Sequence, residues 1–382
     1  MSMNLQRFLL DEWLDQKFSA DPPVEFDLGS STGPVWTLRE LLALAGESGQ
    51  QYLLETALTY TSPAGSRELR EAIAGLSGVD PGDVQVVTGA AEALLILFFL
   101  AAEPGINVVL PQPGFPTNAA LGESLNLEIR YYTLRREDGF RIDTDDIRKL
   151  VDGNTRMVLV NSPHNPTGAV LSDQEMESLH DFCAEHGVQF VSDEVYHPIY
   201  HGAESRSAAR LSHATVLGDF SKALCLSGLR VGWMIERDAA RRRRYLNARS
   251  YFTVSNTALG ERLATLALEH RDAIYARARR VAGASLAQLD QLFSEYGDVL
   301  RWVRHRGGMT AFPWLADGSA GREFCRRLMK RGVLIAPGDC FGMSSHFRLG
   351  FAASGERFPL ALERVAEFLR TEARSRSSVS VV

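Results

Sequence analysis

The chain has 382 residues, of which 45% are hydrophobic and 23% charged, which is ordinary for a soluble globular protein. This length is enough for two or three domains. The formal net charge is −6, so the overall field does not attract nucleic-acid phosphates or an anionic membrane. We therefore expect neither nucleic acid nor a membrane as a partner.

The N-terminal stretch and the cysteines indicate where in the cell the protein is found. The first eleven residues are interrupted by charge and lack an apolar signal core. The four cysteines are widely spaced, with no CxxC pair and no matching histidines. They are Cys183, Cys225, Cys325 and Cys340. This pattern predicts free thiols in a reducing cytoplasm and no metal site.

Residues 84 to 236 alternate short β-branched runs with helical patterns. The strand-like runs are 83–88, 107–110, 127–134, 156–160, 188–191 and 215–217. A helix is expected over 90–102. Its most apolar stretch, 93–102, is about half as long as a bilayer span, so we expect this helix to be buried inside the protein. Ser172 and Glu175 have capping-box spacing and predict a helix to about residue 186. The alternation predicts an α/β fold, with a mostly parallel sheet between helices.

The pattern changes after residue 256. Long helices rich in Ala, Arg and Leu extend to residue 293, followed by strand-like runs at 299–303, 310–313 and 347–351. We expect a large domain over residues 46–270. A smaller α+β domain would combine residues 1–45 with residues 271–382.

Lys222 follows an apolar run, in the segment Asp219-Phe220-Ser221-Lys222. Because burying an ammonium group alone costs several kcal/mol, a lysine in such a place is usually neutralised or covalently engaged. An aldehyde cofactor is the obvious candidate for covalent engagement.

Three further runs accompany this lysine: NSPHNPTG at 161–168, SDEVY at 192–196 and GLRVGW at 228–233. In this order and spacing, from about residue 27 to 351, the chain resembles the fold-type I pyridoxal-phosphate enzymes, in particular the class I/II aminotransferases. The resemblance implies pyridoxal 5′-phosphate as cofactor and transfer of an amino group between an amino acid and a 2-oxo acid.

The resemblance makes Lys222 the catalytic residue, which would hold the cofactor's aldehyde and move the substrate's α-proton. Asp193 would keep the ring nitrogen protonated. Other interpretations of Asp193 are a helix cap or an acid/base pair with Glu194, although adjacent strand residues point to opposite faces.

Three residues match the family's contacts to the cofactor ring. Asn165 and Tyr196 would hydrogen-bond the phenolic oxygen, and Phe115 would stack on the ring. Outside this motif order, Asn165 with Pro166 would indicate only a turn, and the aromatic residues only core packing.

The phosphate has its own candidates. Gly89, Ala90 and Ala91 lie between a strand and a helix, where backbone N–H groups and the positive helix end bind anions. Arg230 matches the family's phosphate-binding arginine, and Ser221 is retained beside the lysine.

Tyr60 and Asp219 also concern the phosphate site. Tyr60 matches the tyrosine that reaches the neighbouring subunit's phosphate, which implies a homodimer with shared active sites. Many relatives have Ser or Thr where this chain has Asp219. A carboxylate there would repel the phosphate, so either Asp219 points away or the phosphate site is rearranged.

For the substrate, Arg348 matches the arginine that binds the α-carboxylate through two hydrogen bonds. An isolated arginine would otherwise suggest a surface ion pair. Gly33 and Trp36 are expected to line the same pocket.

Two other functions stay open. The segments 307–313 and 337–342 resemble a capreomycidine-synthase-like branch, in which a β-hydroxylated basic amino acid loses its β-substituent and cyclises. A regulator that senses pyridoxal phosphate and binds DNA is more remote. The roughly 45 residues before the large domain contain no helix-turn-helix pattern and no basic cluster.

Overall fold

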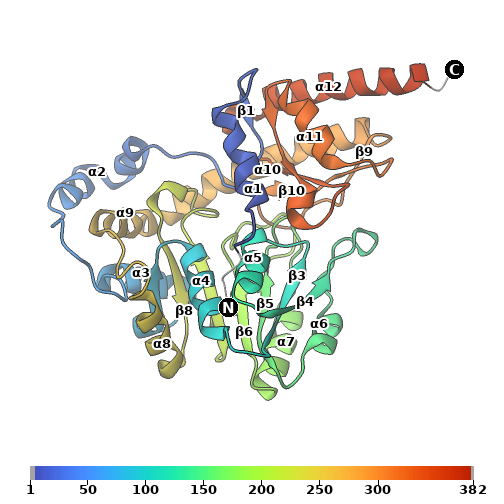
Figure 1. Cartoon of the computed structure of the whole chain (residues 1–382). Helices are drawn as coiled ribbons and strands as arrows, with labels where there is room; N and C mark the ends of the chain where they lie inside the picture. Colours follow the sequence, from blue (N-terminus) through green and yellow to red (C-terminus); the bar gives the residue numbers. More distant parts are fainter. Residues whose placement is uncertain (1–4, 380–382) are drawn as a thin grey trace.

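A computed structural model describes residues 5–379 (Figure 1). Its main sheet has seven strands in the order β2-β8-β7-β6-β5-β3-β4. These are β2 (Val84–Val87), β3 (Asn107–Gln112), β4 (Glu128–Thr133), β5 (Thr155–Asn161), β6 (Gln189–Asp193), β7 (Ala214–Asp219) and β8 (Gly232–Ile235). All neighbouring strands run parallel except β8, which is antiparallel to both β2 and β7. The expected α/β fold with a mostly parallel sheet is confirmed.

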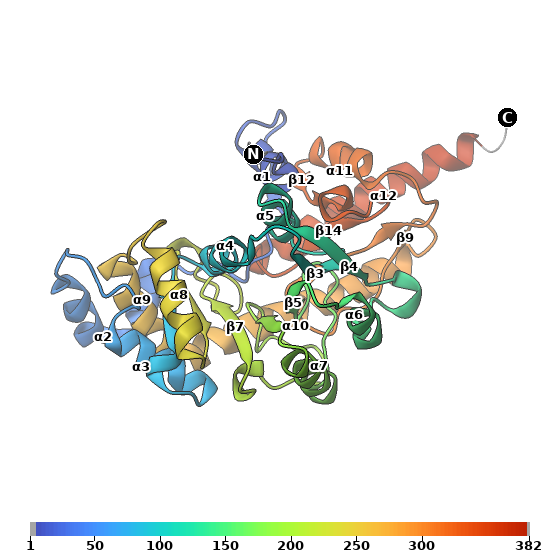
Figure 2. The same ribbon diagram turned by 60° about the horizontal axis from the view of Figure 1, so that its bottom comes forward.

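Helices cover both faces of this sheet (Figure 2). One face packs against α4 (Ala90–Ala101), α5 (Pro116–Ser124) and α8 (Ala239–Arg249). The other packs against α3 (Arg67–Ser77), α6 (Thr144–Leu150), α7 (Asp173–Glu185) and α9 (Ala258–Glu269). Successive strand residues alternate between the two cores: Val158 joins one and Leu159 the other. Burial on both faces explains why the central strands are continuously apolar.

The expected helices of this region are confirmed. The apolar run after β2 forms α4, whose inner side chains are buried. At α7, the Ser172 hydroxyl accepts from the Glu175 N–H at 3.3 Å, and the Glu175 carboxylate accepts from the Ser172 N–H at 2.9 Å. Within residues 5–379, none of the helices combines the length and the apolar character that a membrane crossing needs.

The remaining elements come from both ends of the chain, and all except the helix over 38–54, which lies beside α9 on the left, lie above the sheet in Figure 1. The helices are α1 (Leu9–Asp15), α2 (Leu38–Leu54), α10 (Arg271–Glu295), α11 (Gly321–Met329) and α12 (Phe358–Val379). The short strands are β1 (Phe26–Asp27), β9 (Leu300–Arg301), β10 (Thr310–Ala311), β11 (Trp314–Leu315), β12 (Val333–Leu334), β13 (Ala336–Pro337) and β14 (Phe347–Gly350). β1 pairs with β12, so an N-terminal segment is held by a C-terminal one.

Candidate active site

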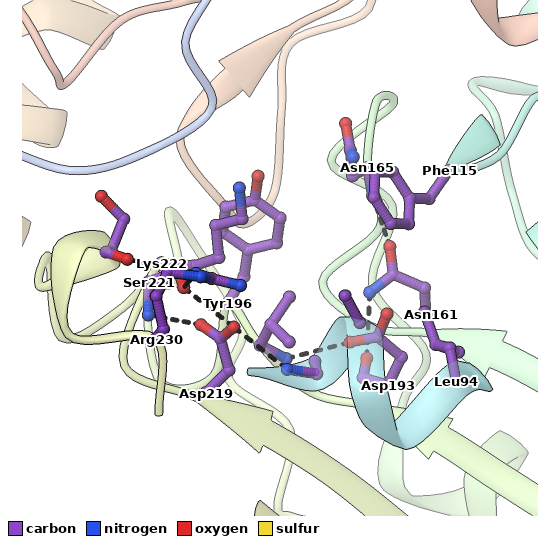
Figure 3. Close-up of a pocket in the computed structure, with 14 residues that line it drawn as sticks. Leu94, Phe115, Asn161, Asn165, Asp193, Tyr196, Asp219, Ser221, Lys222 and Arg230 are labelled. Carbon is purple, nitrogen blue, oxygen red and sulfur yellow. Dashed lines mark hydrogen bonds between the residues drawn. The ribbon is translucent and has the colours of Figure 1, made fainter. Parts of the chain in front are cut away.

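Polar residues end three adjacent parallel strands. Asn161, Asp193 and Asp219 are the last residues of β5, β6 and β7. Because the carboxyl ends of parallel strands lie at one edge of a sheet, the three side chains line one cavity of about 210 Å³ (Figure 3). Its other lining residues are Ala90, Ala91, Leu94, Phe115, Asn165, Val195, Tyr196, Ser221, Lys222, Ser227 and Arg230. The structure therefore brings most of the expected site residues together.

The amine of Lys222 lies within this cavity and is held by the N-terminal segment. Its Nζ donates to the Ser31 hydroxyl at 2.8 Å, and the Tyr196 hydroxyl donates to the Ser31 carbonyl at 2.9 Å. Loss of solvent lowers the pKa of Lys222 to about 8, against the opposing effect of the Asp219 carboxylate. A larger fraction of this lysine is thus an unprotonated amine near neutral pH than is usual.

Asp193 is a buried carboxylate, 5% exposed, without an ion-pair partner among residues 5–371. Its Oδ1 accepts from the Val195 N–H at 3.2 Å. Burial raises the pKa of Asp193 to about 7, and the negative charge of Asp219 adds to this effect. Glu194 instead accepts from the Ser192 hydroxyl at 3.0 Å and the Ala208 N–H at 2.7 Å, away from the cavity. This geometry argues against a Glu194 acid/base pair with Asp193.

Asn165 connects the cavity to Arg348. The Asn165 Oδ1 accepts from Arg348 Nη1 at 3.2 Å. The backbone N–H of Asn165 donates to Asn161 Oδ1 at 2.7 Å. Asn161 Nδ2 in turn donates to the Asp193 carbonyl at 2.9 Å, which ties the ends of β5 and β6 together. Asn161 was not among the expected site residues. Its place as a polar residue ending an apolar strand could have identified it.

Arg348 lies in β14 and is 2% exposed. Its Nη2 donates to the Gly29 carbonyl at 2.8 Å, and its guanidinium lies 4.9 Å from the Phe341 ring centroid. Nε has no hydrogen-bond partner, and among the described side chains no carboxylate pairs with the guanidinium. Because an unpaired buried charge is strongly destabilising, this position suits an arginine that binds an anionic substrate group.

The start of α4 forms an anion-binding site with two nearby side chains. We call it the anion cradle: the N–H groups of Ala90 and Ala91, together with Ser221 and Arg230. Gly89 caps the helix with φ of 76°, and a Cβ on it would lie 2.7 Å from Arg230 Nη2. A larger residue would therefore displace the guanidinium as well as strain the backbone. Arg230 Nη1 donates to the Ser221 hydroxyl at 3.3 Å. Asp219 does not point away from this cradle, because it accepts from the Ala90 N–H at 3.3 Å.

Five expected residues are not part of the cavity lining: Gly89 and Arg348, which lie next to lining residues, and Gly33, Trp36 and Tyr60. Gly33 and Trp36 line a neighbouring cavity, and the Cys225 sulfur packs directly against Gly33. The Trp36 ring lies 4.4 Å from the Arg277 guanidinium. Tyr60 is 85% exposed on the surface. The roles assigned to these residues remain predictions.

A model of the aminotransferase class I and II family matches residues 30–365. The chain belongs to this family.

Members of this aminotransferase family resemble the chain over nearly its whole length. It is 31% identical over 373 residues to capreomycidine synthase from Streptomyces vinaceus, covering 96% of this chain and 95% of that one. It is 30% identical over 341 residues to the aspartate/prephenate aminotransferase of Thermus thermophilus, covering 85% and 86%. A pyridoxal-phosphate-dependent aminotransferase from Streptococcus suis superposes with a TM-score of 0.90 at 29% identity, covering 97% and 99%.

The protein is therefore a pyridoxal-phosphate-dependent aminotransferase, and its cavity fits that cofactor. Asp193 is a buried carboxylate that lacks a cation, which a protonated ring nitrogen would supply. Lys222 offers an amine for the aldehyde. Because Gly89 has no Cβ, the Arg230 guanidinium can lie close to the start of α4, where a phosphate would meet both.

Proposed function

We propose that this aminotransferase moves the amino group of an α-amino acid to a 2-oxo acid in the cavity around Lys222. The observation that carries the proposal is the convergence of an amine with lowered pKa, a buried carboxylate with raised pKa and an unpaired buried arginine. When bound, pyridoxal phosphate supplies an aldehyde for the substrate's amino group and a ring that draws electrons from its α-carbon.

We assign the cofactor contacts to residues of the described cavity and its rim. Asp193 keeps the ring nitrogen protonated, since a carboxylate in this buried position is stabilised by a cation. Asn165 and Tyr196 hydrogen-bond the phenolic oxygen, and Phe115 packs on the ring. The phosphate is held by the N–H groups of Ala90 and Ala91 beside Gly89, and by Ser221 and Arg230.

Substrate binding and proton transfer fall to two residues. Arg348 binds the substrate carboxylate, and its hydrogen bond to Asn165 fixes the guanidinium relative to the cavity. Lys222, as a free amine, takes the proton from the α-carbon and returns it. A pKa of about 8 leaves it partly unprotonated at neutral pH and still able to donate.

Elimination followed by cyclisation is the second candidate, because capreomycidine synthase is similar to the chain over 96% of its length. The segment 307–313 also lies beside the site, since a Cβ on Gly308 would be 3.6 Å from the Tyr196 ring. Both reactions begin with removal of the α-proton, so the residues assigned above serve either one.

We further propose a homodimer with shared active sites, in which Tyr60 reaches the partner's phosphate. Exposed apolar side chains support such an interface: Leu54 and Leu58, which are close to Tyr60 in sequence, and Tyr251 in the segment after α8. The free, buried cysteines support a cytoplasmic location.

The domain division at residues 46 and 270 also stays a proposal. It is supported by the non-helical backbone of Gly46 within α2, where φ is 66°. His270, which separates α9 from α10, supports the second boundary.

The test uses the purified enzyme. Borohydride reduction should fix the cofactor to the peptide that carries Lys222, and Lys222→Ala should abolish both the adduct and turnover, while the exposed Lys149→Ala serves as control. A single amino acid without acceptor should convert the bound cofactor to its aminated form once per site. Continued turnover without acceptor would instead establish elimination, and a protein that never binds the cofactor would refute both functions.

A further inference from the structure

Asp219 occupies the anion cradle with its own carboxylate. It ends β7, is 7% exposed and accepts three hydrogen bonds (Figure 3). Its Oδ2 accepts from the Ala90 N–H at 3.3 Å and from the Ser221 hydroxyl at 2.9 Å. Its Oδ1 accepts from the Ser221 N–H. These donors belong to residues that we assign to the cofactor's phosphate.

The carboxylate is held by neutral donors. Arg230 directs its Nη1 to the Ser221 hydroxyl at 3.3 Å and to the Ser227 carbonyl at 3.1 Å. Lys222 donates to Ser31. Among residues 5–371 no cation forms an ion pair with Asp219. Its negative charge is therefore not cancelled by direct contact with a cation.

A phosphate monoester at neutral pH carries between one and two negative charges and needs hydrogen-bond donors. It cannot share the Ala90 and Ser221 donors with a carboxylate without like-charge repulsion. A serine or threonine at position 219 would add a hydroxyl donor instead. Placement of the phosphate therefore requires the Asp219 carboxylate to give up its hydrogen bonds.

We propose that Asp219 is an internal anion that competes with the cofactor's phosphate for the cradle and so weakens cofactor binding. The inference rests on the proposed cofactor site. Its consequence is selective: the carboxylate opposes the phosphate but leaves the ring contacts of Asp193 and Phe115 in place. The enzyme then holds its cofactor loosely, and its occupancy follows the supply of pyridoxal phosphate.

The experiment compares pyridoxal phosphate with pyridoxal, which lacks the phosphate. Equilibrium titrations followed by visible absorbance give both affinities for the wild type, Asp219→Asn and Asp219→Ser. Removing the charge should strengthen binding of pyridoxal phosphate at least about tenfold more than binding of pyridoxal, whose own change measures the effect of Asp219 on Lys222 and Asp193. The serine variant covers the case in which the asparagine variant does not fold.

Two control variants test whether the change in affinity arises in the anion cradle. Glu194→Gln removes another buried negative charge near Asp193 but none from the cradle, so the ratio of the two affinities should stay at its wild-type value. Ser221→Ala removes a cradle donor and should weaken binding of pyridoxal phosphate alone.

Equal changes for both ligands would overturn the inference, because Asp219 would then act through Lys222 or Asp193. Unchanged or weaker binding of pyridoxal phosphate in both Asp219 variants would also overturn it. These outcomes differ from failure of the proposed function, in which the wild type binds neither ligand at Lys222.

Discussion

Substitution of Asp193 by Asn should stabilise the cofactor-free protein while it removes activity. Burial raises the pKa of this carboxyl group from 3.8 to about 7. Since one pKa unit corresponds to about 1.36 kcal/mol, the ionised carboxylate costs the folded protein up to about 4 kcal/mol. The amide of Asn carries no charge, but its NH₂ group needs a hydrogen-bond partner, which costs about 1–3 kcal/mol. A net gain of about 2 kcal/mol in the free energy of unfolding is therefore expected.

The pH dependence of this gain follows from the direction of the pKa change. Above pH 7 the carboxyl group of Asp193 is ionised in both states, so the wild type carries the whole cost. As the pH falls from 7 towards 3.8, the folded protein takes up a proton before the unfolded chain does, and the cost disappears. The advantage of Asp193→Asn should be largest at pH 8, vanish at about pH 5 to 6 and reverse near pH 4, where only the amide cost of about 1–3 kcal/mol remains.

Urea denaturation of cofactor-stripped wild type and variant between pH 4 and 8.5 measures this difference. Asp152→Asn is the control of opposite sign, because hydrogen bonds to its carboxylate lower the pKa of Asp152 to about 2. With cofactor bound the order should reverse, since the ring nitrogen pairs with Asp193, and turnover of Asp193→Asn should fall by about 100-fold. A stripped Asp193→Asn protein less stable than the wild type at pH 8 would refute this reasoning.

Three further predictions concern other contacts of the site. Ser31→Ala removes the acceptor of the Lys222 ammonium and should move the pKa of Lys222 further below 8, measured as the pH dependence of the rate of cofactor attachment. An unchanged profile would mean that this hydrogen bond does not hold the amine. Arg348→Gln should raise KM for the amino acid by about 30-fold or more without changing the cofactor spectrum. Loss of the cofactor from this variant would show that Arg348 binds the cofactor and not the substrate. Mixing inactive Tyr60→Ala and Lys222→Ala subunits should restore activity in hybrid dimers, and hybrids without activity would exclude a shared site.

The sheet and the strand-end part of the site were predictable because both rest on local patterns. Apolar runs that end in a polar residue identified β6 and its Asp193, and motif order added Lys222 and Arg230. β8 was missed as a strand, because its first two residues, Gly232 and Trp233, were interpreted only as part of the motif at 228–233. Its antiparallel pairing with β7 sets the backbone of Gly232 against Gly89 at the cradle.

Contacts between distant segments could not be predicted. Ser31 lies 191 residues from Lys222 and 165 from Tyr196, and nothing in the run around it indicates a site. Gly33 and Trp36, also in the N-terminal segment, were expected to line the same pocket as Arg348. The side chain of Cys225 packs against Gly33, so these residues line the neighbouring cavity instead.

The sequence likewise did not decide which way the Asp219 side chain points. The position of this carboxylate changes the pKa values of the other titratable residues in the site. Its negative charge raises the pKa of Asp193 and also opposes the lowering of the pKa of Lys222. A neutral residue at position 219 would therefore make Lys222 a better free amine at neutral pH and Asp193 a weaker proton acceptor. Asp219 thus links two properties of the site: the charge that competes with the phosphate also keeps the catalytic lysine more protonated. Tighter cofactor binding in Asp219→Asn should accordingly come with a shift of the activity profile to lower pH.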